Sequence, residues 1–110
     1  MKDKDLEEEN YLQCPIEFTM EKIVGKRKLV ILWHIYDKKV IRYGELKNSV
    51  YKISHKILSN HLKELINDGI ISKKIYPEVP PKVEYSLTKF GETLIPIMDI
   101  LCKWGTDNQK

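Results

Sequence analysis

The spacing of apolar residues changes at Gly69, from the period of a helix to the period of a strand. Over residues 54–69 apolar side chains recur every three or four positions, as they do on one face of a helix. Over 71–76 and 82–87 apolar and polar residues alternate, as they do in half-buried strands. The proline-rich segment Pro77–Pro81 between these two runs suits neither a helix nor a central strand. We therefore expect one short helix followed directly by a projecting β-hairpin.

The predicted helix at 54–69 carries its own start and stop signals. Ser54 occupies the position of an N-cap, and Gly69 occupies the position of a C-terminal stop. With Leu62 at the centre of the apolar face, the opposite face carries small polar and basic side chains. Short hydrogen-bonding side chains suit DNA base edges and cations suit phosphates, so this face is typical of a helix in a major groove. An ordinary amphipathic helix with a solvated face stays open as the alternative.

The chain before this helix predicts three more helices and one short strand. Cys14 and Pro15 fit the cap and the first position of a helix that Gly25 ends. The next apolar run is apolar nearly all round, which favours a central buried helix over a buried strand. Tyr43 and Leu46 are expected to contact the core from a short helix. In chain order the expected elements are a helix at 15–24, a buried helix at 29–36, an edge strand at 40–42 and a short helix at 43–50.

The last part of the chain predicts one apolar helix that is capped by Thr88. Pro96 is expected to kink this helix, because proline removes a backbone donor and crowds the carbonyl of Glu92. The apolar stripe exceeds what one small core needs, so we interpret the excess as a subunit interface. Closure of the chain's own core is the alternative. The stripe consists of Phe90, Leu94, Ile97, Met98, Leu101 and Trp104.

The length and the charge distribution bound the possible partners. A chain of 110 residues is expected to form one domain, which we place at 14–107 behind a mobile leader at 1–13. The first ten residues carry a net charge of −3 and the remainder carries +6, which is compatible with a polyanion partner. The sequence lacks an apolar run of membrane-spanning length and a signal peptide. We therefore expect no membrane partner and a cytoplasmic location.

Several kinds of chemistry lack the residue patterns that they need. Cys14 and Cys102 lie far apart, and the three histidines show no ligand spacing with them, so neither a metal site nor a structural disulfide is expected. The sequence has no glycine-rich phosphate loop, no carboxylate pair at useful spacing and no nucleophile with a base. We therefore expect a protein that is not an enzyme and that has no cofactor.

The order of predicted elements is that of a winged helix-turn-helix. The expected fold class is mainly α with a small β-hairpin, in the order α-α-β-α-α-β-β-α. We expect the protein to dimerise through its terminal helices. Over about residues 13–105 the chain resembles the HxlR-type family of bacterial and archaeal regulators, which are relatives of the MarR group. This resemblance implies a homodimeric, DNA-binding transcription factor. The family's usual Gly-Lys-Trp reads Gly25-Lys26-Arg27 here. The matching residues include Cys14-Pro15, Leu32-Trp33, Tyr43–Leu46, Ile53-Ser54, Leu58-Ser59 and, most specifically, Pro80–Thr88.

Individual residues of the predicted recognition helix and hairpin have expected roles. Lys56 and Asn60 lie one turn apart on the outer face and are the candidates for base edges, with Asn suited to adenine and Lys to guanine. His61 is expected to be a half-packed structural group. Ile57 could contact a thymine methyl group or a neighbouring helix, and both alternatives remain open. The other candidates are Ser54, His55 and Ser59, expected to touch phosphates or cap the helix, and Lys63, Lys73, Lys74 and Lys82, expected to contact the DNA backbone.

The sequence thus predicts a sequence-specific regulator that binds double-stranded DNA as a homodimer on a near-palindromic operator. Two recognition helices would lie about 34 Å apart. The alternative is a winged-helix module for protein–protein interaction without DNA binding, in which the lysines would not gather on one exposed surface. A small-molecule effector in the dimer interface stays open, and no residue identifies it.

Cys14 carries a separate hypothesis about regulation. A thiol at a helix start lies near the positive end of the helix dipole, which favours the thiolate and therefore reactivity. Some HxlR-type regulators are similar at this position and sense oxidants or electrophiles. A buried, inert thiol is the alternative for Cys14, and Cys102 is expected to fill the core or an interface.

Overall fold

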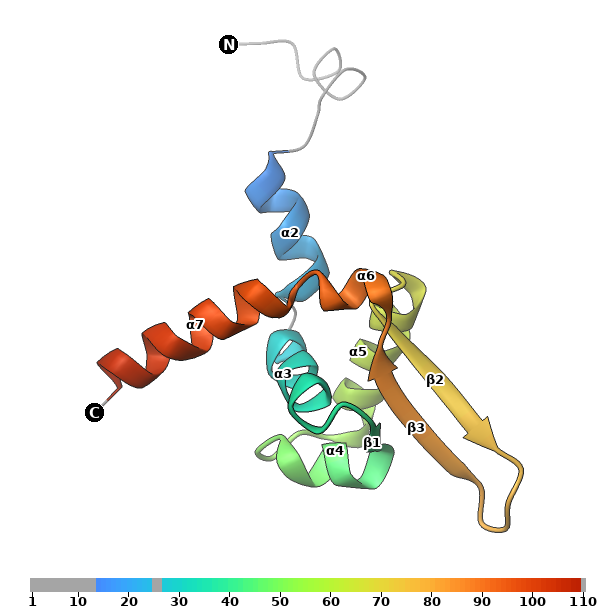
Figure 1. The fold of residues 1–110 in the computed structure, drawn as a ribbon. Helices are drawn as coiled ribbons and strands as arrows, with labels where there is room; N and C mark the ends of the chain where they lie inside the picture. Colours follow the sequence, from blue (N-terminus) through green and yellow to red (C-terminus); the bar gives the residue numbers. More distant parts are fainter. Residues whose placement is uncertain (1–13, 25–26, 110) are drawn as a thin grey trace, which may run out of the picture.

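The computed structural model, which describes residues 14–24 and 27–109, contains the projecting hairpin that the sequence predicts (Figure 1). Strands β2 (Ile71–Tyr76) and β3 (Lys82–Leu87) are antiparallel. The short strand β1 (Ile41–Arg42) pairs with β3 to give the sheet order β1-β3-β2. The predicted edge strand and the mainly helical winged fold are therefore confirmed. The leader at 1–13 and the helix stop at Gly25 lie outside the described residues.

The helix that precedes the hairpin is α5 (His55–Asn67), with both predicted ends. The Oγ atom of Ser54 accepts a hydrogen bond of 3.1 Å from the backbone N–H of Ile57, so Ser54 is the N-cap. Gly69 has a positive φ of 74°, which a glycine adopts without strain, and it follows directly on the last turn. The apolar face of α5 buries Leu58, Leu62 and Leu65 in the core.

Three helices precede α5, and the second of them is the central helix that the sequence predicts, with one exposed apolar residue. The apolar run at 29–36 is helical, as expected, but Val30 keeps 44% of its surface exposed. The prediction of a central helix is confirmed: Ile31, Leu32 and Ile35 are fully buried, and Leu29, Trp33 and Tyr36 pack partly against the core. The three helices are α2 (Pro15–Ile23), with Cys14 at the N-cap position, α3 (Lys28–Lys38) and α4 (Tyr43–Ser49).

The last part of the chain forms two helices instead of one kinked helix. Helix α6 (Lys89–Glu92) is separated by a turn from α7 (Ile95–Asn108). Pro96 lies in the first turn of α7, where the missing backbone N–H would have no helical partner in any case. The predicted kink at Pro96 was therefore wrong: the proline begins a helix. The predicted cap is present, since the Oγ1 atom of Thr88 accepts a hydrogen bond of 2.9 Å from the N–H of Gly91.

The end of α5, the hairpin and α6 meet at one close contact. The N–H of Thr88 donates to the carbonyl of Ile70 at 3.0 Å, and the Thr88 hydroxyl donates to the carbonyl of Gly69 at 2.6 Å. Gly91 packs so close to Ile70 that a Cβ atom would collide with the Ile70 carbonyl oxygen. This contact joins the start of α6 to the point where α5 gives way to β2, so it fixes the hairpin relative to α5.

Candidate nucleic-acid interface

The outer face of α5 presents a polar stripe to solvent. Lys56, Asn60 and Lys63 are exposed and are spaced at i, i+4 and i+7, which places them on one side of the helix. The predicted candidates His55 and Ser59 are also exposed, on the turns that carry Lys56 and Asn60. This stripe combines an amide, hydroxyl groups and amino groups, which are the groups that hydrogen-bond base edges and phosphates.

Tyr43, predicted only as a core contact, also reaches this polar surface. Its ring packs partly against the core, and its hydroxyl lies 2.8 Å from Nδ1 of His55 and 3.4 Å from Oγ of Ser59. Burial raises the pKa of Tyr85 on β3, and electrostatic interaction with Tyr43 raises it further. Local sequence patterns could not reveal these contacts, because the residues belong to different elements.

The hairpin divides its lysines between two faces. Lys74 and Lys82 both lie over the ring of Tyr76, with Nζ atoms 5.0 and 4.6 Å from its centroid. Lys82 also lies 3.6 Å from Glu84, which accepts a hydrogen bond of 3.0 Å from the Tyr76 hydroxyl. Lys73 pairs with Tyr85 across the strands, and therefore lies on the opposite face, which packs on the helices. The structure thus brings Lys74 and Lys82 together and places Lys73 apart from them.

An ion pair connects α5 to α3. The Nζ atom of Lys28 lies 2.9 Å from a carboxylate oxygen of Glu64, and Nδ1 of His61 lies 3.4 Å from the same oxygen. The hydrogen bond from Lys28, followed by that from His61, lowers the pKa of Glu64. His61 is packed, with 12% of its side chain exposed, and its buried Nε2 has no hydrogen-bond partner among the described residues. The prediction that His61 is a partly packed side chain is confirmed.

Two further details concern positions that the sequence left open. Ile57 packs against the core, which favours the neighbouring-helix alternative for this side chain. Arg27, where the family usually has tryptophan, donates a side-chain hydrogen bond to the backbone carbonyl of Tyr51. Tyr51 lies in the turn before α5.

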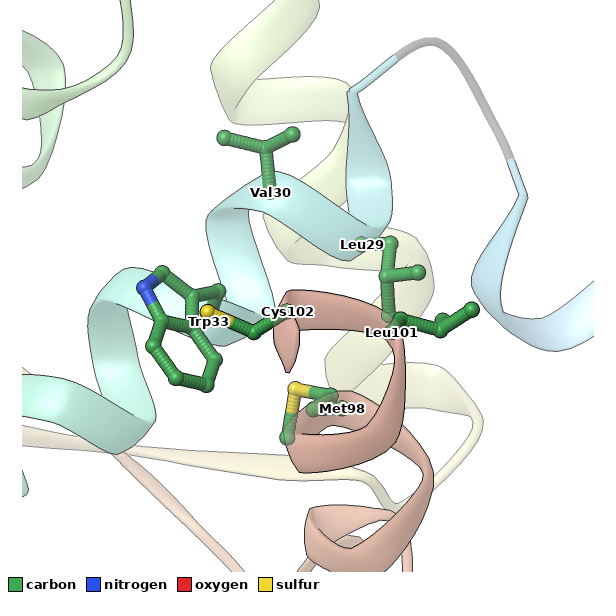
Figure 2. Close-up of a pocket in the computed structure, with 6 residues that line it drawn as sticks. All are labelled: Leu29, Val30, Trp33, Met98, Leu101 and Cys102. Atoms are coloured by element: carbon green, nitrogen blue, oxygen red, sulfur yellow. The ribbon is translucent and has the colours of Figure 1, made fainter. Parts of the chain in front are cut away.

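The faces of α2 and α7 expose many large apolar side chains. Both helices extend away from the sheet, and the end of α7 lies across the molecule from the hairpin tip (Figure 1). Between α3 and α7 lies an open apolar groove of about 290 Å³ (Figure 2). It is lined by Leu29, Val30 and Trp33 of α3 and by Met98, Leu101 and Cys102 of α7. The exposed apolar residues beyond it are Ile16, Phe18 and Met20 on α2, Val24 directly after α2, and Ile97, Ile100 and Trp104 on α7.

Both cysteines are exposed in the described part of the chain. Cys14 lies at the N-cap of α2, as predicted, and it is exposed rather than buried as the alternative expected. Cys102 is not in the core and lines the groove between α3 and α7. Across residues 14–24 and 27–109, no cluster of three His, Cys, Asp or Glu side chains could hold a metal ion. Within the same residues, no helix is both long enough and apolar enough to cross a membrane.

Comparison with known proteins identifies the family of this chain. The model of the HxlR-like helix-turn-helix family matches residues 22–110. The chain belongs to this family. It is 48% identical over 104 residues to MalR of Fusobacterium mortiferum, a proposed regulatory protein, covering 94% of this chain and 98% of MalR. The chain is therefore a helix-turn-helix transcriptional regulator of the HxlR type, and not an enzyme.

Solved structures of similar sequence have the same fold as this chain. The redox regulator HypR in its oxidized form superposes with a TM-score of 0.83 at 42% identity, covering 88% of this chain and 99% of HypR. A proposed MarR-family regulator from Porphyromonas gingivalis gives a TM-score of 0.82 at 44% identity, covering 98% and 97% of the two chains. The winged helix-turn-helix assignment and the likeness to the MarR group are therefore confirmed.

Proposed function

We propose that this regulator binds double-stranded DNA sequence-specifically, as a homodimer on a near-palindromic operator. The observation that carries the proposal is the exposed stripe of Lys56, Asn60 and Lys63 on α5, with a lysine-bearing hairpin directly after it. In this proposal Lys56 and Asn60 read base edges in the major groove. Lys63 and the hairpin lysines Lys73, Lys74 and Lys82 neutralise phosphates, while Ser54 caps the helix.

The division of the hairpin lysines suits a wing that lies along the DNA backbone. Lys74 and Lys82 share one face with Tyr76, and their amino groups lie 5.0 and 4.6 Å from the centroid of its ring. Lys73 lies on the opposite face, that of Tyr85, and is exposed. Both faces of a narrow hairpin can approach the phosphates that border a groove, so amino groups on each side contribute to the electrostatic part of binding.

A second copy of this chain is the proposed occupant of the apolar surface on α2 and α7. Ile100 and Trp104 keep 69% and 68% of their surface exposed, and Ile16 on α2 keeps 64%. An apolar area spread over two helices marks an interaction surface, and two-fold dimers are the commonest assembly. Both helices extend away from the sheet, so pairing through them leaves the hairpin uncovered (Figure 1). In the proposed dimer the two copies of α5 face the same side of the DNA.

DNA binding is tested first by its dependence on salt. We expect the logarithm of the affinity to fall linearly with the logarithm of the salt concentration, because bound phosphates release counterions. Lys63→Gln should weaken binding to all sequences and reduce that slope by about 1. Lys103→Gln on α7, which removes an exposed amino group paired with Asp107, is the matched control and should change neither quantity. A salt-independent affinity, or no affinity, would favour the protein–protein module instead.

We further propose that Cys14 makes DNA binding responsive to oxidants or electrophiles. Two observations support this: Cys14 is exposed at the N-cap of α2, and the similar protein HypR is a redox regulator. The thiolate is the reactive form of cysteine, and a helix N-terminus favours it. Diamide should release wild-type protein and Cys102→Ser from DNA, and it should leave Cys14→Ser bound. Equal release of the wild type and Cys14→Ser would remove the redox proposal while leaving DNA binding intact.

A further inference from the structure

The hydroxyl of Tyr43 holds two side chains of the recognition helix at once. It lies 2.8 Å from Nδ1 of His55 and 3.4 Å from Oγ of Ser59, one helical turn further on. The rings of Tyr43 and His55 are almost parallel, at 7° with centroids 5.7 Å apart. Tyr43 is the first residue of α4, and its ring packs partly against the core. Packing therefore restricts the position of its hydroxyl group. The imidazole of His55 is therefore held in one orientation although the residue is exposed.

The chemistry of this contact determines which nitrogen of His55 carries the proton. A phenol O–H is a stronger donor than an imidazole N–H, and an imidazole nitrogen is a stronger acceptor than a phenol oxygen. We therefore expect Tyr43 to donate to Nδ1 of His55 and to accept from the hydroxyl of Ser59. In a neutral imidazole, a hydrogen bond accepted by one nitrogen places the proton on the other. The N–H group of His55 is then at Nε2, on the edge of the ring away from Tyr43.

We propose that Tyr43 is a positioning residue for DNA recognition. It fixes His55 in the tautomer and orientation that offer Nε2–H to an acceptor on the DNA, either a phosphate oxygen or the O6 or N7 atom of a guanine. No hydrogen bond to this nitrogen occurs within the described residues, so it is available to a ligand. Ordering the side chain before binding reduces the entropy lost on association. This inference rests on the proposed DNA-binding function and adds a residue outside the recognition helix to it.

The first test measures the hydrogen bond in the protein without DNA. Nitrogen-15 NMR of the imidazole rings should show Nδ1 of His55 as an acceptor nitrogen and Nε2 as a protonated one. Tyr43→Phe keeps the ring and its packing but removes the donor, so the two tautomers of His55 should then mix. Tyr36→Phe removes a hydroxyl that lies 3.5 Å from Asp99 of α7, and it should leave the His55 signals unchanged. Identical His55 signals in the wild type and Tyr43→Phe would overturn the inference.

The second test measures affinity for an operator obtained by selection from random DNA. Loss of one hydrogen bond predicts that Tyr43→Phe binds about threefold to tenfold more weakly, with Tyr36→Phe unchanged. His55→Gln places an amide group near the position of Nε2 and should retain more affinity than His55→Asn, which places it near Nδ1. Added to His55→Asn, the Tyr43→Phe change should have a smaller effect than it has in the wild type, because only the contact with Ser59 is then lost.

The outcomes separate this inference from the proposed function. Two results would overturn the role of Tyr43 alone. The first is that the wild type binds DNA and Tyr43→Phe binds it with the same affinity. The second is that Tyr43→Phe reduces affinity equally in the wild type and in His55→Asn. Absence of wild-type binding to any selected DNA would overturn both proposals. A loss that is uniform over DNA sequences identifies a phosphate as the acceptor, whereas a loss confined to one G·C pair in each half-site identifies a guanine.

Discussion

The ammonium group of Lys28 in α3 lies 2.9 Å from a carboxylate oxygen of Glu64 in α5, and the two ends of this ion pair differ in burial. The Lys28 side chain is 7% exposed, whereas that of Glu64 is 55% exposed. Removal of the carboxylate therefore leaves a buried ammonium without a countercharge, while removal of the ammonium leaves a carboxylate that water can solvate. Because the pair joins the central helix to the recognition helix, it also contributes to the orientation of α5.

This asymmetry predicts unequal effects on stability. Glu64→Gln should lower the free energy of unfolding by about 1–2 kcal/mol, because the buried ammonium loses its ionic partner. Lys28→Met fills a similar volume without a charge and should change the free energy of unfolding by less than about 1 kcal/mol. Urea unfolding followed by circular dichroism measures both values. A larger loss for Lys28→Met than for Glu64→Gln would contradict the burial argument.

The same contact predicts a dependence of stability on pH. Lys28 and then His61 lower the pKa of Glu64 in the folded protein below its ordinary value of 4.5. A depressed folded pKa stabilises the protein above the unfolded pKa, and this contribution is lost as the pH falls through the folded pKa. The difference in unfolding free energy between the wild type and Glu64→Gln should thus be constant near neutral pH and should shrink below about pH 4.5. A difference in unfolding free energy that grows as the pH falls would contradict this role of Glu64.

Gly91 supports a third prediction, which concerns the joint between α6 and the hairpin. A methyl group at this position would collide with the backbone carbonyl of Ile70, which cannot move without shifting the start of β2. Gly91→Ala should therefore lower the free energy of unfolding by about 2 kcal/mol or more. Gly44→Ala is the matched control, because nothing lies within 4 Å of the added carbon there. Thermal unfolding of the two variants should show a clear loss for Gly91→Ala only.

The elements that local patterns describe could be predicted from the sequence. Ser54 and Gly69 delimit the recognition helix, and the change of period at Gly69 predicts the hairpin. Pro96 shows where local patterns stop being sufficient. A proline can kink a helix or begin one, and the choice depends on the turn after Glu92, which the apolar stripe does not reveal.

Contacts between distant elements could not be predicted in the same way. Lys28 and Glu64 are 36 positions apart, and Tyr43 and His55 belong to consecutive helices whose crossing places one hydroxyl between two side chains. Each of these side chains alone resembles an ordinary surface or core residue. Their roles depend on tertiary packing, which the apolar pattern specifies only as a set of buried faces.

The proposed dimer leads to a fourth prediction, about the exposed side chain of Trp104. Trp104→Glu places a charge on the apolar surface of α7, and burial of an unpaired charge in an interface is unfavourable. We expect this variant to be a folded monomer, because Trp104 contributes little to the core. Val79→Glu introduces the same charge at the hairpin tip, where the side chain is fully exposed, and should remain a dimer. Analytical ultracentrifugation measures the mass of each variant, and a dimeric Trp104→Glu would contradict the assigned interface.

Selection of bound sequences from a random pool of double-stranded DNA tests the central claim most directly. If α5 reads the major groove in a two-fold dimer, the wild type should enrich two inverted half-sites whose centres lie about 34 Å apart along the helix. Asn60→Ala should relax the preference at one position of each half-site, whereas Lys63→Gln should weaken binding without changing the enriched sequence. Enrichment of no common sequence, or the same sequence preference for the wild type and for a protein lacking both Lys56 and Asn60, would contradict the account.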